Sequence, residues 1–176
     1  MSSKRLLQSL FHYKASVDDE LFVALAGLAD APVADRLVPA LRVLHHAHIV
    51  DRIFAANLEG RAHAYPASWS DTPPALAELA AGVRRTDQWY LDYLSRLDAE
   101  ALDQMVDFTF TDGGAGRMSR AEMLAHVVTH GGYHRGEAGR LLPEIETTAM
   151  RDVFAGFLHR SEPQRRWTRG FVNAPE

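Results

Sequence analysis

Residues 125–137 read AHVVTHGGYHRGE and place three histidines at intervals of four: His126, His130 and His134. On an α-helix of about 100° per residue, these side chains fall within about 80° of one another. Val127 belongs to the same stripe, so the apolar side of the helix is also its histidine side. The segment therefore predicts a helix that carries several imidazoles toward the interior of a helical protein.

The ends of this helix follow from its flanking residues. Ser119 and Glu122 have the spacing of a capping box, so we expect the helix to start at Ser119 and to end just before Pro143. Gly131 and Gly132 each cost about 1 kcal/mol relative to Ala inside a helix. We expect them to make room for a neighbouring helix or a ligand, and a simple kink is the alternative.

Helical spacing of apolar residues continues outward from this segment. Steps of three and four predict three further long helices, over residues 3–28, 34–58 and 72–97, with Thr72 as the N-cap of the last. We expect a short helix near residues 150–158 and an irregular tail from residue 161.

The segment before the histidine-rich helix has a different pattern. QMVDFTFTD (104–112) is rich in β-forming residues and GGAG (113–116) has turn chemistry, which predicts a hairpin that pairs residues 106–111 with residues near Arg117. The fold class is therefore all-α, a four-helix bundle with a short β-hairpin excursion between helices 3 and 4. We expect one domain over residues 1–176, with a core over about 3–160 and a tail over 161–176.

Composition limits what the protein can do. The chain has 176 residues, 47% of them hydrophobic, which is enough for one sizeable core. A formal net charge of −4 argues against a general nucleic-acid binder, which would show a basic face. Cysteine is absent, which excludes disulfides, thiolate nucleophiles and thiolate ligands, so any thiol chemistry needs a thiol from a small molecule.

A membrane or secretory segment is not expected. The longest uncharged apolar run, residues 21–29, is far shorter than the roughly 20 residues that a membrane helix needs. The N-terminus, MSSKRLLQSLFHYK, lacks the apolar centre of a signal peptide. We therefore expect a cytoplasmic protein with no membrane partner.

The histidines of the fourth helix have the spacing of metal ligands. Two imidazoles one helical turn apart can chelate one ion, and here three follow one another. Core histidines held by hydrogen bonds are the alternative, but each would need a buried partner, and Glu137 is the acidic residue that shares the stripe. We therefore favour a metal site.

A third ligand is expected from the second helix, which contains His45, His46 and His48. On a helical wheel the aliphatic residues cluster around His46, while His45 and His48 lie about 100° and 160° away, so His46 should face the bundle interior. Three histidines without a fourth protein ligand leave one position open for water or substrate, which is typical of catalytic zinc-type sites.

Several other catalytic motifs are missing. Gly-Gly-Tyr separates the two later histidines of the fourth helix, so there is no HExxH, and no Glu-x-x-His pair supports a di-iron bundle. The chain also lacks GxxxxGK[ST], GxGxxG and a GxSxG elbow, which excludes the common phosphate-loop and serine-hydrolase signatures.

Both histidine segments together resemble the DinB family of DinB/YfiT-like metalloenzymes. They are LHHAHIVDRIFAANLEG (44–60) and HVVTHGGYHRGEAGRLLPE (126–144). The hairpin VDFTFTDGGAGRMSRAEML (106–124) and the opening helix LQSLFHYKASVDDELFVALAGL (7–28) also fit, so the resemblance covers about residues 5–160.

The resemblance implies a bundle that holds one divalent metal ion through His46, His130 and His134. The family pattern has Asn before the first ligand, where this chain has His45. The common His-Arg-Gly-Gln ends here with Glu137, which adds a carboxylate near the site.

The resemblance also implies an activity. Characterised members of the wider superfamily are metal-dependent transferases or isomerases that use low-molecular-weight thiols such as mycothiol or bacillithiol. We therefore expect a zinc or nickel ion, an external thiol, a small-molecule substrate and S-transfer as the reaction. Two alternatives remain open: a hydrolase that activates water at the metal, and a non-catalytic, stress-related bundle with a structural metal.

Other residues near the histidines have expected roles. Glu137 is the candidate catalytic residue, either a partner of a ligand histidine or a proton acceptor, and a surface ion pair is the alternative. His126 should line or cap the pocket. Trp89 and Tyr93 could wall the substrate site, with core packing as the alternative. Arg135 points away from both ligands of its helix, so we expect a structural or interface role.

An oligomer is also predicted. Leu41 and Leu44 fall outside the histidine-bearing face of the second helix, and apolar residues beyond the core stripe suggest a partner surface. Together with the habit of the family, this predicts a homodimer.

Overall fold

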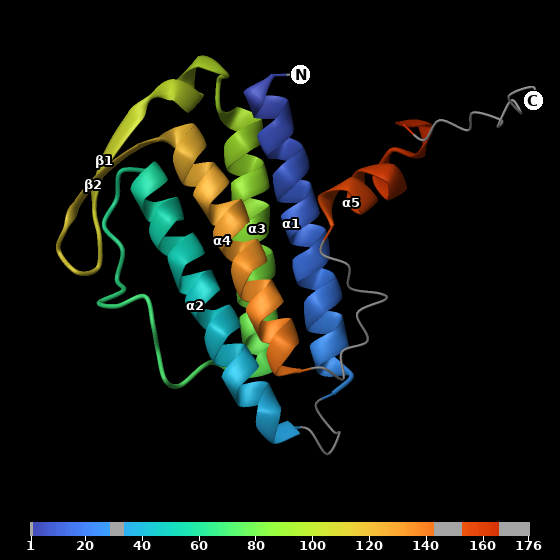
Figure 1. The fold of residues 1–176 in the computed structure, drawn as a ribbon. Coiled ribbons are helices and arrows are strands. Elements are labelled where there is room, and N and C mark those ends of the chain that lie inside the picture. Colours follow the sequence, from blue (N-terminus) through green and yellow to red (C-terminus); the bar gives the residue numbers. More distant parts are fainter. Residues whose placement is uncertain (1, 29–33, 143–152, 166–176) are drawn as a thin grey trace, which may run out of the picture.

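The computed structural model describes residues 2–28, 34–142 and 153–165, and it confirms the four-helix bundle (Figure 1). In chain order, its elements are α1 Ser3–Ala26, α2 Ala34–Leu58, α3 Leu76–Arg96, the 3₁₀ turn η1 Glu100–Asp103, β1 Met105–Thr109, β2 Ala115–Ser119, α4 Arg120–Leu141, α5 Phe154–Ser161 and the 3₁₀ turn η2 Pro163–Arg165. None of the described helices is long and apolar enough to cross a membrane.

The third helix starts later than predicted. α3 begins at Leu76, and its N-cap is Ala75 rather than Thr72. Pro73 and Pro74 explain the difference, because a residue that precedes proline is disfavoured in the helical region, so the helix starts only after both prolines. α4 begins as expected: Ser119 and Glu122 form both hydrogen bonds of the capping box.

The C-terminal prediction is only partly within the described residues. The expected helix near 150–158 starts in residues outside them, and the described α5 covers Phe154–Ser161. α5 lies against α1, where the rings of Phe154 and Phe157 are 5.4 and 5.9 Å from that of Tyr13. Residues 166–176 of the expected tail lie outside the described part of the chain.

The predicted hairpin is present with shorter strands. Met105–Thr109 pairs antiparallel with Ala115–Ser119, and Phe108 lies opposite Gly116. The first strand ends at Thr109 rather than residue 111, because Phe110 and Gly113 close the turn through a backbone hydrogen bond of 2.9 Å. Gly113 has a φ of +88°, a conformation that glycine adopts without strain. β1 contacts α2 and β2 contacts α4, so the hairpin spans the two helices that carry the histidines.

The bundle interior has two apolar halves. One combines the C-terminal parts of α1 and α4 with the N-terminal parts of α2 and α3, and it includes Leu41 and Leu44. The other contains Phe11, Phe54 and Tyr90 and lies toward the hairpin. Because Leu41 and Leu44 are 8% and 5% exposed, their proposed role at a dimer surface is wrong: they belong to the core.

Between the two halves lies a charge layer, formed by Lys14, Asp18, Asp51, Asp87 and Arg135, all of them buried. The Lys14 Nζ atom lies 2.9 Å from Asp18 Oδ2, 2.9 Å from Asp51 Oδ2 and 2.6 Å from Asp87 Oδ1. Arg135 Nη1 lies 3.0 Å from Asp18 Oδ1. The layer takes at least one residue from each of the four long helices, so it joins all of them at one level.

The pKa values in the charge layer reflect burial and mutual attraction. Burial alone would lower the pKa of Lys14, but the three carboxylates raise it well above its usual value. Burial raises the pKa of Asp51 to about 6 and also raises that of Asp87, although Lys14 opposes both shifts. Burial acts the same way on Asp18, where Lys14 and Arg135 outweigh it and lower the pKa.

Gly131 makes room for this layer. A Cβ atom at Gly131 would lie 3.2 Å from Arg135 Nη1 and 3.3 Å from Lys14 Cε. The space predicted from the glycine pair therefore serves a neighbouring helix at this position. A Cβ atom at Gly136, in the same helix, would meet nothing within 4 Å.

We expect opposite effects from larger side chains at these two glycines. Gly136→Ala should raise the free energy of unfolding by about 0.5–1 kcal/mol, because Ala loses less backbone entropy in a helix. Gly131→Val should lower it by about 1–3 kcal/mol through overpacking against the charge layer. Urea unfolding of both variants measures the two changes, and a Gly131→Val protein as stable as the parent would contradict the tight packing.

Candidate metal centre

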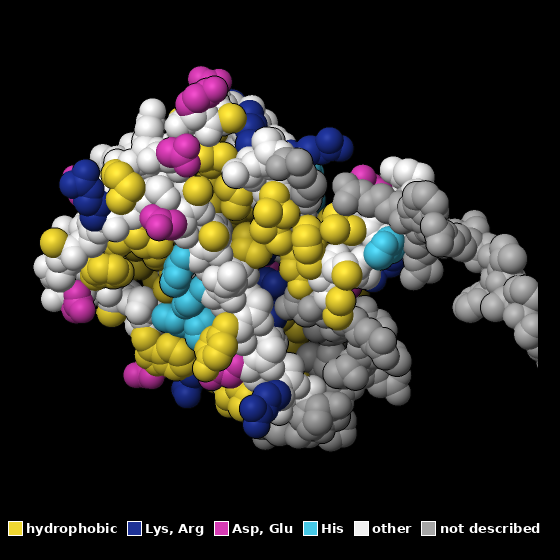
Figure 2. Space-filling model, turned by 45° about the horizontal axis from the view of Figure 1, so that its top comes forward, with side chains coloured by type: hydrophobic (Ala, Val, Ile, Leu, Met, Phe, Trp, Pro, Cys, Tyr) yellow, Lys and Arg dark blue, Asp and Glu magenta, His cyan; other side chains and the backbone are white. Residues whose placement is uncertain are grey.

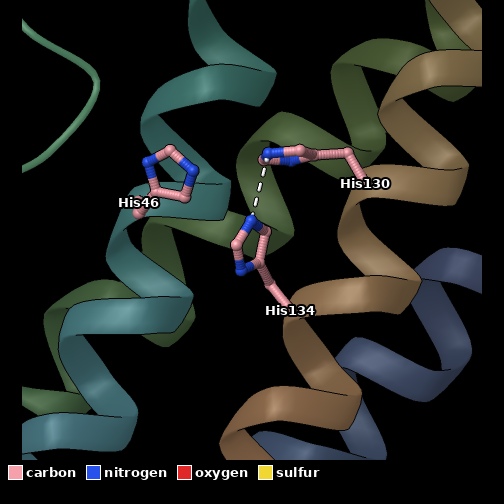
Figure 3. A group of neighbouring side chains, drawn as sticks. All are labelled: His46, His130 and His134. Carbon is pink, nitrogen blue, oxygen red and sulfur yellow. Dashed lines mark hydrogen bonds between the residues drawn. The ribbon is translucent and has the colours of Figure 1, made fainter.

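Three imidazoles converge between α2 and α4. His46 comes from α2, and His130 and His134 come from successive turns of α4; Figure 3 shows the rings turned toward one another. One ring nitrogen of each residue lies within 4.8 Å of the others. The structure thus brings together the three histidines that the sequence selected as metal ligands.

Two of the rings are oriented by hydrogen bonds. The His46 Nδ1 atom lies 2.8 Å from the Ser68 carbonyl oxygen, and the His134 Nδ1 atom lies 2.9 Å from Glu137 Oε2. Both partners are hydrogen-bond acceptors, so each Nδ1 carries the proton and Nε2 is the nitrogen that is left to bind a metal ion. Sequence reasoning missed Ser68, because a loop carbonyl can come from any residue type.

The third ring, that of His130, leaves some hydrogen-bonding groups of the cluster without a partner among the described residues. His130 Nε2 lies 3.1 Å from His134 Nε2, so the two nitrogens need a proton or a cation between them. His130 Nδ1 is buried and has no hydrogen-bond partner among the described residues. Neutral imidazoles are ligands that zinc, nickel, copper and iron accept, so this donor set fits a divalent transition metal.

Burial favours the neutral form of the His130 and His134 rings. Burial lowers the pKa of His130 to about 3, and the neighbouring His134, His126 and His46 add to the effect. Burial also lowers the pKa of His134, although its hydrogen bond to Glu137 opposes the shift. The neutral imidazole is the form that binds metal, so both rings are ready to bind an ion at neutral pH.

The other histidines of α2 lie elsewhere. His48 is buried against α3, where its Nε2 atom lies 3.1 Å from Thr86 Oγ1 and where a Cβ atom on Gly82 would lie 2.8 Å from its Cε1 atom. Burial lowers the pKa of His48 to about 4. His45 is absent from the three-histidine group of the described residues.

His126 lies one turn before the cluster and extends it. Its ring stacks on that of His130, with centroids 5.1 Å apart, and on that of Phe54, at 4.6 Å. Burial lowers the pKa of His126. The residue lines a cavity next to the cluster, which is the location expected from the sequence.

Trp89 and Tyr93 lie away from the cluster. Their rings stack with centroids 5.0 Å apart and pack against the apolar half that contains Tyr90. Trp89 also lines a separate cavity, which includes none of the three clustered histidines. Trp69 and Tyr133 lie beside the cluster instead, with ring centroids 5.7 Å from that of His46 and 5.0 Å from that of His134. No periodic pattern in its loop could have identified Trp69.

Arg135 has the structural role expected from its helical phase. It is 6% exposed and pairs with Asp18 in the charge layer. Glu137 lies on the outer side of His134 and is 45% exposed, so it contacts both a clustered imidazole and solvent.

The DinB superfamily model matches residues 26–138, a range that includes His46, His130, His134 and Glu137. The chain belongs to the DinB superfamily. No curated protein and no solved structure matches it. This DinB protein therefore has the three-histidine group between α2 and α4 as its candidate metal centre.

Proposed function

We propose that this DinB protein is a metal-dependent enzyme that activates a low-molecular-weight thiol for transfer to an electrophile. The observation that supports the proposal is the convergence of three imidazoles, those of His46, His130 and His134, with no fourth ligand in the group among the described residues. A zinc or nickel ion bound there would supply a Lewis acid that lowers the pKa of a thiol or of water.

Glu137 supports this site through His134. Its carboxylate accepts the Nδ1 proton of His134 and so directs the Nε2 lone pair toward the other two rings. Such a carboxylate partner raises the basicity of the ligand histidine. Because Glu137 is 45% exposed, it can also exchange a proton with solvent, which is the reason that we assign it a catalytic role.

The thiol must come from outside the chain, because the sequence contains no cysteine. Mycothiol, bacillithiol and glutathione are therefore suitable probes. In the proposed reaction the thiol loses its proton to solvent or to Glu137, and its sulfur forms a bond to the electrophilic carbon. The bond from that carbon to its leaving group breaks, and the leaving group departs with the bonding electrons, as chloride does from 1-chloro-2,4-dinitrobenzene. Cytoplasmic thiols are kept reduced, so we also propose a cytoplasmic location.

A thiol panel tests this activity. Untagged protein loaded with zinc or nickel is mixed with each thiol and with 1-chloro-2,4-dinitrobenzene, and thioether formation is followed by absorbance. We expect turnover that needs both metal and thiol and that chelation or His130→Ala abolishes. Metal-dependent turnover of ester substrates without any thiol would replace the proposal with a hydrolase. Metal that raises the melting temperature without any turnover would indicate a structural ion.

Removing the carboxylate next to His134 should weaken metal binding. We expect Glu137→Ala to lower the affinity for zinc by about 10–100-fold, the usual cost of losing the partner of a ligand histidine. Arg140→Ala is the matched control, since Arg140 is an exposed residue of the same helix. Competition with a chromogenic chelator measures both affinities, and equal values for the two variants would contradict the role of Glu137.

A homodimer is part of the proposal. Tyr133 and Leu141 of α4 and Val23 of α1 are exposed apolar side chains, 71%, 39% and 66% accessible, which a second copy could cover. Light scattering at micromolar concentration decides the question, because a mass near 19.6 kDa would mean a monomer. That result would leave the metal site unaffected, since all three histidines come from one chain.

A further inference from the structure

A cavity of about 320 Å³ lies next to His130 and is lined by residues of α2, α4, the hairpin and the loop after α2. Figure 2 shows histidine side chains gathered on this face of the molecule and bordered by hydrophobic side chains. The lining residues are mainly apolar or aromatic and include Val50, Ile53, Phe54, Phe108, Phe110 and Met118. The cavity is about twice the roughly 150 Å³ of an engineered apolar cavity that holds benzene, so it has room for a ring with substituents.

The cavity has no charged lining residue. Lys, Arg, Asp and Glu are all absent from the described residues that form it. An ionic ligand would lose its hydration here without gaining a counter-ion, which disfavours anions and cations alike.

The walls favour flat groups. Phe54, His126 and His130 stack in succession, with centroid distances of 4.6 and 5.1 Å, and this row of rings leads from the cavity to the three-histidine cluster. Phe108 also lines the cavity, with its ring 6.0 Å from that of Phe54, and the hairpin holds it over Gly116. A Cβ atom at Gly116 would lie 2.6 Å from the ring of Phe108, so glycine is what allows this position.

One polar group in the wall lacks a partner. Asn57 lines the cavity, and its Nδ2 atom is buried with no hydrogen-bond partner among the described residues. A buried amide that makes no hydrogen bond is costly, and an oxygen on a ligand in the cavity would remove this cost. Asn57 is therefore suited to donate to a carbonyl oxygen.

We propose that this cavity binds the uncharged, ring-containing part of the substrate and that Asn57 recognises a carbonyl oxygen on it. The inference rests on the proposed function, because that function requires a substrate next to the three histidines. It adds the substrate class, an apolar carbonyl compound rather than a charged metabolite, and it identifies Asn57 and Ile53 as residues that determine specificity.

Binding of simple probes tests the inference without any turnover. Acetophenone carries a ring and a carbonyl, ethylbenzene lacks the carbonyl, and benzoate adds a charge. NMR titration of protein stripped of metal should show binding of the first two, with acetophenone about fivefold tighter because of one hydrogen bond. Benzoate should bind at least about tenfold more weakly than acetophenone, since its charge is desolvated without a counter-ion.

Two variants make the test specific. Asn57→Leu should remove the preference for acetophenone and retain binding of ethylbenzene, whereas Ile53→Trp should fill the cavity and abolish binding of both probes. Gln88→Leu is the matched control, because it makes the same amide-to-leucine change at an exposed position of α3. Thermal melting confirms that each variant is folded.

The outcomes separate this inference from the proposed function. Folded parent protein that binds neither probe would overturn the inference, and so would an acetophenone preference that survives Asn57→Leu. Zinc stoichiometry, measured on the same samples, reports on the histidine cluster independently. Probe binding without zinc binding would support the inference about the cavity and contradict the proposed metal-dependent enzyme. Zinc binding without probe binding would leave the proposed enzyme standing and overturn the inference about the cavity.

Discussion

Replacing His46 with alanine is expected to abolish stoichiometric metal binding, with a loss of affinity greater than about 100-fold. Loss of a partner that only orients a ligand already costs about 10–100-fold, and loss of the ligand itself should cost more. His46 is the contribution of α2 to the cluster, so its removal leaves only His130 and His134 on one helix. Metal analysis after dialysis and a chelator competition measure the change.

His45→Ala and His48→Ala are the matched controls for this variant. Both remove a histidine from the same helix, but neither residue belongs to the three-histidine group, and His48 contacts Thr86 on α3 instead. Each control should keep about one metal ion per chain. Loss of the ion from His48→Ala together with its retention in His46→Ala would mean that the rotational phase of α2 is wrong.

Lys14→Met should destabilise the bundle strongly, lowering the free energy of unfolding by about 3–5 kcal/mol at neutral pH. The substitution retains most of the volume and removes the cation that three buried carboxylates share. Asp51 and Asp87 would lose the Lys14 ammonium, which lies 2.9 and 2.6 Å from their carboxylate oxygens. Lys4→Met is the control, since Lys4 is the other lysine of the chain and donates to the Ser95 carbonyl oxygen, outside the charge layer.

The effect of Lys14→Met should depend on pH in a defined direction. Burial already raises the pKa of Asp51 to about 6, and loss of Lys14 would raise it further in the folded state. A carboxyl with a folded pKa above its unfolded value of about 3.9 binds more protons when folded, so stability falls as the pH rises through that window. The difference from the parent should therefore be larger at pH 8 than at pH 5, and urea unfolding at both values measures it.

Much of the candidate site could be predicted from the sequence because helix geometry is local. The spacing of His130 and His134 fixes their common face, and the aliphatic residues around His46 fix the phase of α2. Ser119 and Glu122 likewise determine the start of α4 through their own side chains. These features need only a few consecutive residues, so periodicity and capping chemistry are sufficient.

The missed features depend on contacts between distant residues. Lys14 and Asp87 are 73 positions apart, and the spacing of Lys14 and Asp18 is also typical of an exposed ion pair on one helix. The prediction that Leu41 and Leu44 lie at a dimer surface is wrong because a helical wheel of α2 alone does not show which of its sides the neighbouring helices cover. The cavity beside His130 depends on the hairpin folding over α2 and α4, which strand propensities do not encode.

The charge layer also has a consequence for how the helices align along their axes. Apolar side chains of similar size can repack if one helix slides by a turn, about 5.4 Å, but a displaced Asp51 would lose Lys14 and remain buried. Asp51 and His46 lie on the same helix. The ion pair between Asp51 and Lys14 fixes the position of α2 along its axis relative to α1, and it thereby also fixes the position of His46 relative to the imidazoles of α4.

Insertion of one residue between His46 and Asp51 rotates the two by about 100° relative to each other, so only one of them can keep its contacts. We infer that this part of α2 tolerates changes of side chain far better than changes of length, a difference that metal affinity in a set of point and insertion variants would reveal.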